Sequence, residues 1–345
     1  MTHLRKAAPF AALGLAALTL AGCTSAPAEG AADAAPSKEA AEPATITLYT
    51  SEPDEKAAEL VAAFNEIHPE ITVEVFRAGT GDLTTRVAAE QEAGEIQADV
   101  FLAADAPTFE KYAADGLLLE YTPADIDAIN PDVVDAEGFY VGTRIIPTII
   151  AYNTSLITEA PDSWEALTDP AYADQIVMPN PDVSGAAAFN ASVWLNTPEL
   201  GEQWLEDLAA NNPVIADSNG PVSQAVATGA QPVGIVVDYL IRELAEQGSP
   251  VAVAYPSEGV PYVSQPAGIF ADTDEPEAAQ LFVDFLVSAE GQELAVEQSY
   301  LPVRNDVGTP EGAPSMDEIE ILPQDLEQIG STQDAAVELF RSLFL

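Results

Sequence analysis

The chain has 345 residues, of which 57 are Asp or Glu and only 11 are Lys or Arg, so its formal net charge is −46 at pH 7. We expect no nucleic-acid binding, because neutralising phosphates requires clustered Lys and Arg. The only cysteine, Cys23, cannot form an internal disulfide, so the fold depends on its hydrophobic core.

The N-terminus has the pattern of a bacterial lipoprotein signal peptide. Arg5 and Lys6 precede an apolar run over 7–21, and the sequence Leu-Ala-Gly-Cys ends at Cys23. A membrane-spanning helix needs about 20 apolar residues, more than this run provides. The pattern therefore predicts a signal peptide over 1–22 and a lipid on Cys23, which would anchor the protein on the extracytoplasmic face of the cell membrane.

An Ala/Pro/Glu-rich segment follows Cys23. It has almost no large apolar side chains and cannot form a core of its own. We interpret 23–44 as a flexible linker that holds the folded body away from the membrane.

The first half of the body repeats strand, turn and helix. Strands are expected at 45–50, 71–76 and 100–104, each followed by a helix. Ser51 is the expected N-cap of the first helix, with Pro53 in its first turn. The strand-end turns contain Ser51-Glu52, Gly79-Thr80-Gly81 and Ala104-Asp105.

The pattern starts again after a buried-looking stretch at 145–152. Strands are expected at 175–178 and 233–237, and helices begin near Gly185, Pro198, Asn219 and Asp238. Further helical segments are expected at 277–287 and 335–345.

This alternation predicts an α/β fold with parallel sheets in two lobes. Such sheets bind ligands beyond the carboxyl ends of their strands, where the loops converge. The first lobe is expected over 45–144, completed by about 267–312, and the second over 145–266, completed by 313–345.

An ordered set of segments resembles the solute-binding proteins of ABC importers with the type II periplasmic-binding fold. The set resembles in particular the branch that binds ferric ion, phosphonates or organophosphates. The matching segments are Leu-Tyr-Thr-Ser at 48–51, Ala-Asp-Val-Phe-Leu-Ala-Ala-Asp at 98–105, Tyr-Asn-Thr at 152–154, Ser-Trp-Glu-Ala-Leu at 163–167, Met-Pro-Asn-Pro at 178–181 before Ser184-Gly185, Asn-Gly-Pro at 219–221 and Val-Gly-Ile-Val-Val-Asp-Tyr at 233–239. The resemblance implies a solute clamped between two lobes, and a membrane permease and an ATPase as partner subunits.

Hydroxyl groups and helix starts favour a small phosphonate or phosphate ester as the solute. Ser51, Thr80-Gly81 and Ser184-Gly185 offer hydroxyls and backbone N–H groups to an anion. Arg144 could add a bidentate contact, and Asp105 or Asp238 could meet an amino group. The predicted ligand-binding residues are Ser51, Glu52, Thr80, Gly81, Asp105, Arg144, Ser184, Gly185, Asn219, Asp238 and Tyr239. Helix capping alone is an equally simple interpretation of Ser51, Ser184, Asp105 and Asp238.

Ferric iron is the alternative cargo. The resemblance implies two adjacent tyrosines as iron ligands, at the place where this chain has Tyr239 followed by Leu240. Only Tyr239 of that pair is present, and His68 is the one histidine beyond the predicted signal peptide. No cofactor is expected, so Fe³⁺ would be bound as cargo.

An extracellular hydrolase is the main alternative from another class. A Ser-His-Asp triad would have to use His68, and the sequence contains no Gly-x-Ser-x-Gly motif. We therefore expect a monomeric binding protein rather than an enzyme.

Overall fold

The computed structural model describes residues 43–345, which lie in one compact unit, Glu42–Leu345. The predicted signal peptide, Cys23 and nearly all of the predicted linker fall outside these residues. The first strand already begins at Ala44. Within the described part, no helix combines the length and the apolar character that crossing a membrane requires.

Lobe 1 is built on a five-stranded sheet in the order β2-β1-β3-β11-β4. The first three strands are parallel, and β11 pairs antiparallel with both β3 and β4. The strands are β1 (Ala44–Thr50), β2 (Ile71–Arg77), β3 (Val100–Leu102), β4 (Tyr140–Gly142) and β11 (Pro266–Ile269). The helices of this lobe are α1 (Asp54–Ile67), α2 (Thr80–Ala93), α3 (Ala106–Ala114), α8 (Pro276–Val287) and α9 (Ala289–Glu297).

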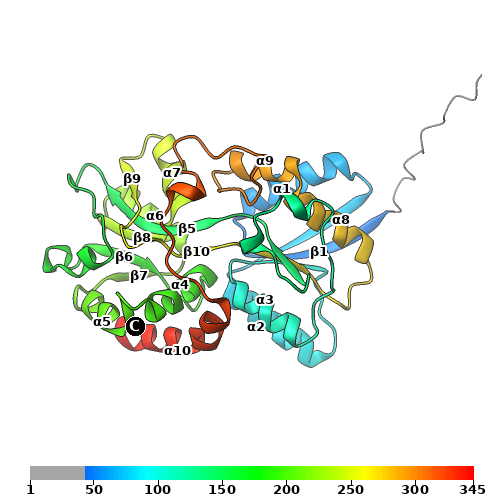
Figure 1. Cartoon of the computed structure of the whole chain (residues 1–345), viewed down its shortest axis with the longest axis horizontal. Coiled ribbons are helices and arrows are strands. Elements are labelled where there is room, and N and C mark those ends of the chain that lie inside the picture. Colours follow the sequence, from blue (N-terminus) through cyan, green and yellow to red (C-terminus); the bar gives the residue numbers. More distant parts are fainter. Residues whose placement is uncertain (1–42) are drawn as a thin grey trace, which may run out of the picture. The chain divides into compact units, whose positions relative to one another are not determined.

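Lobe 2 has a six-stranded sheet in the order β10-β5-β8-β6-β7, with β9 pairing β5 (Figure 1). Its strands are β5 (Ile146–Asn153), β6 (Ile176–Pro179), β7 (Val214–Ala216), β8 (Val233–Val237), β9 (Val251–Ala254) and β10 (Tyr262–Val263). Its helices are α4 (Gly185–Asn196), α5 (Gly201–Ala210), α6 (Asn219–Thr228), α7 (Asp238–Glu246) and α10 (Leu326–Phe344). The C-terminal helix α10 packs on α4 and also contacts α3 of lobe 1. The predicted two-lobed α/β fold is thus confirmed.

The chain crosses between the lobes in segments that pair with one another. In the crossing from β4 to β5, the N–H groups of Thr143 and Arg144 donate to Ser264 O, in the crossing from β10 to β11, at 3.0 and 3.2 Å. Ile145 N donates to Leu301 O at 2.8 Å, which adds a third segment. Gln265, in the crossing from β10 to β11, has a φ of 41°, a left-handed conformation that few non-glycine residues adopt. These segments form the hinge.

Each lobe has packed aromatic side chains in its core. In lobe 2, Trp164, Trp194 and Trp204 pack together with ring centroids 5.4 to 6.2 Å apart. In lobe 1, Phe64 of α1 packs edge-on against Phe282 of α8 at 5.1 Å. Burying one such side chain stabilises its lobe by about 2–3 kcal/mol.

Three predicted helix boundaries differ from the structure. The first helix begins at Asp54 and not after Ser51, because the Ser51 hydroxyl accepts from Ala104 N at 3.3 Å and so stays with the loop after β3. Helix α5 begins at Gly201, whose φ of 65° ends a turn that contains Pro198. Helix α10 begins at Leu326, where Asp325 caps it by accepting from Gln328 N at 3.1 Å.

Candidate functional site

A cavity of about 530 Å³ lies between the lobes, where the loops that follow their strands meet. Lobe 1 contributes the loops after β1, β2 and β3, and lobe 2 contributes those after β6, β7 and β8. Seven of the predicted ligand-binding residues line this cavity: Ser51, Glu52, Thr80, Ser184, Gly185, Asn219 and Tyr239. The other four, Gly81, Asp105, Arg144 and Asp238, do not.

Five helices begin at this cavity. The cavity-lining residues include the N-cap or first-turn residues of α1, α2, α4, α6 and α7. The first four N–H groups of a helix have no partner within the helix, and its dipole places positive charge at that end. The lining is therefore rich in donors for an anion. This convergence follows from the parallel strands within each mixed sheet, β1 to β3 in lobe 1 and β6 to β8 in lobe 2.

Ser184 and Asn219 link the starts of α4 and α6 through hydrogen bonds. The Ser184 hydroxyl accepts from Ala187 N at 3.3 Å, which caps α4, and from Asn219 Nδ2 at 3.1 Å. Asn219 Oδ1 accepts from Val237 N at 3.3 Å. Both bonds to Ser184 use its oxygen as the acceptor, so its O–H remains available as a donor. Asn219 positions the α4 and α6 starts against the end of β8.

Arg77 is the cationic side chain that lines the cavity. Its Nε donates to Glu52 O at 3.2 Å. Within residues 43–345, no carboxylate lies within 4.0 Å of its guanidinium, whereas six of the eight Lys and Arg side chains there form ion pairs with Asp or Glu. The exposed acids Asp82 and Asp217 line the same cavity, from lobe 1 and lobe 2 respectively.

Arg144 lies next to the cavity wall and pairs with Glu52. Its Nη1 is 3.1 Å from Glu52 Oε2, and both side chains are almost fully buried. Glu52 also accepts from Gln265 Nε2 and Tyr300 Oη, each at 2.6 Å. The Arg144 guanidinium stacks on the Tyr300 ring, 4.6 Å from its centroid. The Glu52 carboxylate is therefore already bonded to residues of the hinge segments, although Glu52 also lines the cavity.

The Asp238 side chain belongs to a buried network of hydrogen bonds and an ion pair. It pairs with Arg242, one turn along α7, and accepts from Tyr255 Oη at 3.2 Å. Arg242 in turn donates to Ser299 O at 2.6 Å. Burial raises the pKa of Asp238 even though Arg242 favours its charged form. These contacts explain Asp238 as a structural residue.

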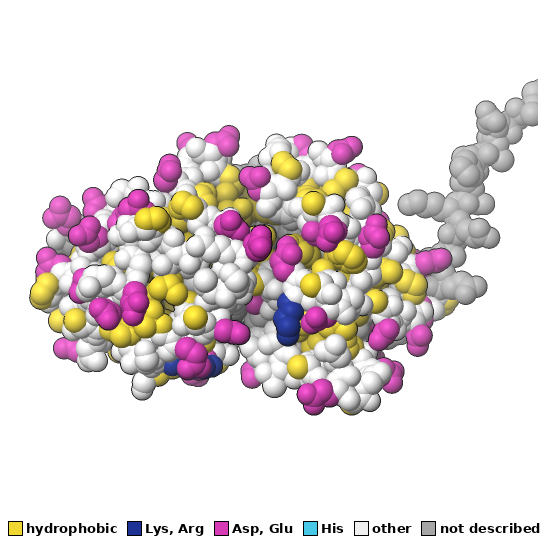
Figure 2. Space-filling model, turned by 60° about the horizontal axis from the view of Figure 1, so that its bottom comes forward, with side chains coloured by type: hydrophobic (Ala, Val, Ile, Leu, Met, Phe, Trp, Pro, Cys, Tyr) yellow, Lys and Arg dark blue, Asp and Glu magenta, His cyan; other side chains and the backbone are white. Residues whose placement is uncertain are grey.

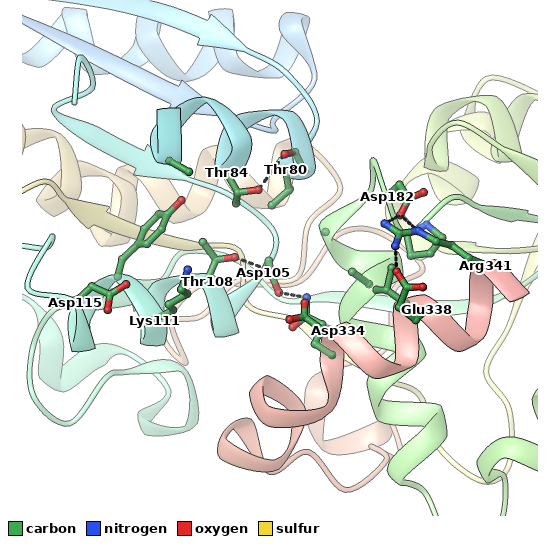
Figure 3. A pocket seen from close by; sticks show the side chains of 18 of the residues that line it. Thr80, Thr84, Asp105, Thr108, Lys111, Asp115, Asp182, Asp334, Glu338 and Arg341 are labelled. Atoms are coloured by element: carbon green, nitrogen blue, oxygen red, sulfur yellow. Dashed lines mark hydrogen bonds and ion pairs between the residues drawn. The ribbon is translucent and has the colours of Figure 1, made fainter. Parts of the chain in front are cut away.

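Asp105 lies at a second cavity of about 620 Å³, formed by α2, α3, α4 and α10. Its carboxylate accepts from Thr108 Oγ1 at 2.5 Å and from Gln333 Nε2 of α10 at 3.1 Å. Burial raises its pKa to about 6. Figure 3 shows the two sides of this cavity. Labelled there are Thr80, Thr84, Thr108, Lys111 and Asp115 on the lobe 1 side, and Asp334, Glu338 and Arg341 on α10.

Two phenol groups meet at the ligand cavity. Tyr239 and Tyr300 both line it, with ring centroids 4.4 Å apart. Burial, and then the charge of Glu52, raises the pKa of both phenols above the ordinary range. Both therefore stay protonated near neutral pH. His68 ends α1 away from the cavity, 3.3 Å from Glu70.

No group of three or more His, Cys, Asp or Glu side chains in the described part is placed to hold a metal ion. Near the cavity, the Tyr300 phenol and the Arg144 guanidinium are both bonded to the Glu52 carboxylate.

Sequence reasoning missed several residues that line the cavity. Arg77 directly ends β2, so the rule that selected the loops after strands could also have selected it. Gln265 and Tyr300 had no such signal, because they come from hinge segments far along the chain. The missed residues include Arg77, Asp82, Asp217, Gln265 and Tyr300.

The surface around the two lobes is strongly acidic. Figure 2 shows Asp and Glu side chains scattered over the face that it presents, with few Lys or Arg among them. Of the Lys and Arg residues in the described part of the chain, Arg77 is the one that lines the ligand cavity.

Comparison with known proteins assigns the family. The family model for bacterial extracellular solute-binding proteins matches residues 95–325, more than half of the chain. A relative in Salmonella typhimurium strain LT2, named "Putative 2-aminoethylphosphonate-binding periplasmic protein", is 28% identical over 292 residues, which are 78% of this chain and 80% of that protein. Both descriptions are of binding proteins and not of enzymes.

Two solved structures share the fold. Iron-bound HitA from Pseudomonas aeruginosa has a TM-score of 0.77 and 24% identity, covering 88% of this chain and all of the other. The periplasmic binding protein AfuA from Actinobacillus pleuropneumoniae, with fructose-6-phosphate bound, has a TM-score of 0.80 and 22% identity, covering 87% of this chain and 98% of the other. By its family match and its two-lobed architecture, the chain belongs to the bacterial extracellular solute-binding proteins.

Proposed function

We propose that this chain, the solute-binding protein of an ABC importer, captures a small phosphonate or phosphate monoester in the cavity between its lobes. The name of the Salmonella relative and the sugar phosphate held by the structural neighbour support this class of cargo.

The observation that carries the proposal is Arg77, an unpaired guanidinium at a cavity where helices begin. A phosphonate or phosphate group carries oxygens that accept two parallel N–H bonds from arginine. The helix starts of α2, α4 and α6 supply further N–H donors and a favourable dipole. Ser184 adds a hydroxyl donor. Among residues 43–345, no other Lys or Arg lines this cavity, so Arg77 is the expected anchor for the anionic group.

A cationic group on the same solute would meet Asp82 or Asp217. Both carboxylates line the cavity and are exposed, and neither forms an ion pair with another described residue. An aminoalkylphosphonate carries both charges. We therefore expect 2-aminoethylphosphonate to bind more tightly than ethylphosphonate, which lacks the ammonium group.

Ferric iron is the second candidate, because Tyr239 and Tyr300 lie together at the cavity. A ferric site needs phenolate oxygens, which are the hard donors that suit this ion. The raised pKa of both phenols opposes that form, and the Tyr300 hydroxyl is already bonded to Glu52. These contacts favour the organic anion.

A thermal-shift screen tests the cargo. The purified protein is heated with 2-aminoethylphosphonate, ethylphosphonate, a sugar phosphate or ferric citrate. A solute at about 100 times its Kd stabilises the native state by about 2.7 kcal/mol, which raises Tm by roughly 5 °C in a protein of this size. We expect this rise with the phosphorus compounds, and a smaller one in Ser184→Ala, which lacks the hydroxyl.

The same screen can also assign iron as the cargo. A rise with ferric citrate alone, accompanied by a visible tyrosinate-to-iron absorbance that Tyr239→Phe abolishes, would replace the organophosphorus assignment with iron.

The wider role also belongs to the proposal. The protein catalyses nothing and acts as a monomer, delivering its cargo to the permease and ATPase subunits with which its family works. Acylation of Cys23 would hold it on the extracytoplasmic face of the membrane. Mass spectrometry of the membrane-bound protein should find the lipid on Cys23, and Cys23→Ala should release the protein from the membrane.

A further inference from the structure

Backbone from the two lobes comes into direct contact at three glycines. A Cβ on Gly81 of α2 would lie 2.2 Å from Asp182 O, and one on Gly79 would lie 2.8 Å from Val183 O. On the other lobe, a Cβ on Gly185 would lie 2.8 Å from Ala104 O and from Thr80. Real Cβ contacts are essentially never below 3.0 Å, and the opposing atoms here include backbone. No side chain fits at these positions unless the lobes separate.

The contact is reciprocal and joins helix starts to carbonyl groups. Gly81 N, in the first turn of α2, donates to Val183 O of lobe 2 at 3.5 Å. The Ala104 carbonyl of lobe 1 lies against Gly185, the first residue of α4 in lobe 2. A carbonyl oxygen at a helix N-terminus meets unpartnered N–H groups and the positive end of the dipole. Each lobe therefore offers the other a favourable backbone contact on closing.

The same residues separate the two cavities. Thr80 and Gly185 line both the ligand cavity and the second cavity beside α10. Figure 3 shows Thr80 on the lobe 1 side and Asp182 across from it. With this contact closed, one wall of the ligand cavity is formed by the meeting lobes. A small separation here would join the two cavities and open the ligand to solvent.

We propose that Gly79, Gly81 and Gly185 set the affinity for the cargo, because their missing side chains let the lobes close over it. The proposal rests on the proposed function only in that a solute is held between the lobes, and it does not depend on which solute that is.

Gly81→Ala is the sharpest test. Gly81 is the second residue of α2, where alanine is a better helix former than glycine by up to about 1 kcal/mol. The substitution therefore leaves lobe 1 intact. Its methyl group would push Asp182 O from 2.2 Å to at least 3.0 Å, a separation of about 0.8 Å at this point.

Gly308→Ala is the matched control. Gly308 is exposed and lines neither interlobe cavity, and a Cβ there meets nothing within 4 Å. Both variants replace a glycine by alanine and add one methyl group, and only Gly81→Ala disturbs the contact between the lobes.

Calorimetric titration and small-angle X-ray scattering give the readouts, with 2-aminoethylphosphonate as the probe. Ferric citrate replaces it if the wild type responds to iron, so an error in the cargo does not affect this test. We expect Gly81→Ala to bind at least tenfold more weakly, with a larger radius of gyration at saturation and an unchanged Tm without probe. Gly308→Ala should match the wild type. Wild-type affinity and compactness in Gly81→Ala would overturn the proposal.

Discussion

Arg77 and Arg144 both lie where lobe 1 meets the cleft, yet their surroundings give them different roles. Arg144 is buried against Glu52 and the Tyr300 ring, whereas Arg77 is exposed and has no carboxylate partner in the described part of the chain. Sequence reasoning selected Arg144 because it enters the crossing between the lobes. It could not show that Glu52, 92 positions earlier (144 − 52), would neutralise it.

Arg144→Ala should therefore lower stability. Removing one partner of a buried ion pair costs about 3–5 kcal/mol, because the other charge stays buried without compensation. We expect a clearly lower urea midpoint for Arg144→Ala, and partial recovery in Glu52→Gln/Arg144→Met, which removes both charges. An Arg144→Ala protein with wild-type stability that fails to bind solute would instead make Arg144 a ligand contact.

Asp105 makes stability depend on pH. Its folded pKa of about 6 lies above the unfolded value of about 3.9, so the folded state binds more protons between these values. The contribution of this group to stability is full below about pH 4 and is lost as the pH rises through 6. The difference of about two pKa units corresponds to about 3 kcal/mol.

Asp105→Asn should remove this dependence. We expect the urea midpoint of the variant, measured relative to that of the wild type, to increase between pH 4.5 and pH 8. The reason is that the wild type must bury a charge at the higher pH. Asp334→Asn, at an exposed position on the same cavity, should track the wild type. A gap between Asp105→Asn and the wild type that stays constant with pH would contradict this account.

At the scale of elements, the order of strands and helices was predictable because hydrophobic periodicity is local. Helix α1 buries Ala57, Leu60 and Phe64 at the expected spacing, and Gly116 follows α3 with a φ of 72°, as expected for a helix end. The strand pairing of β11 was not predictable. It inserts antiparallel between β3 and β4, so that Ala267 pairs with Leu102, 165 positions earlier (267 − 102), and with Val141, 126 positions earlier (267 − 141).

The C-terminal helix shows the same limit. The apolar pattern near the C-terminus predicted a helix only over 335–345, whereas α10 begins at Leu326. Its first half contains mostly polar residues, some of which hydrogen-bond to α4, so the hydrophobic periodicity there is weak. What fixes it is packing: Ile329, Ala336 and Phe340 are buried.

Helix α10 should contribute to the stability of lobe 2 through Phe340. This ring is 1% exposed and stacks with Phe344 at 4.5 Å. Truncating a buried phenylalanine costs about 3–5 kcal/mol, so Phe340→Ala should markedly lower the denaturation midpoint. Leu345→Ala, at a residue that is 66% exposed, should leave it unchanged. Equal midpoints for the two variants would mean that α10 adds little to the fold.

At the scale of the whole molecule, the strong negative charge and an anionic cargo have to be reconciled. The field of a net charge of −46 repels anions at long range, but salt screens it beyond about 8 Å at physiological ionic strength. Binding is then decided by donors within the cavity. The described part of the chain has few cations. An arginine without a carboxylate partner there, at a cavity where several helices begin, therefore indicates an anion site despite the acidic surface.

The most direct test of an anion held by Arg77 is isothermal titration calorimetry with 2-aminoethylphosphonate at about 0.15 M salt. Three proteins are compared: the wild type, Arg77→Ala and Arg86→Ala. Arg86 pairs with Glu90 and lines neither interlobe cavity, so its removal makes the same charge change away from the site. We predict at least a tenfold loss of affinity in Arg77→Ala and none in Arg86→Ala. Equal affinity in all three proteins would contradict the account.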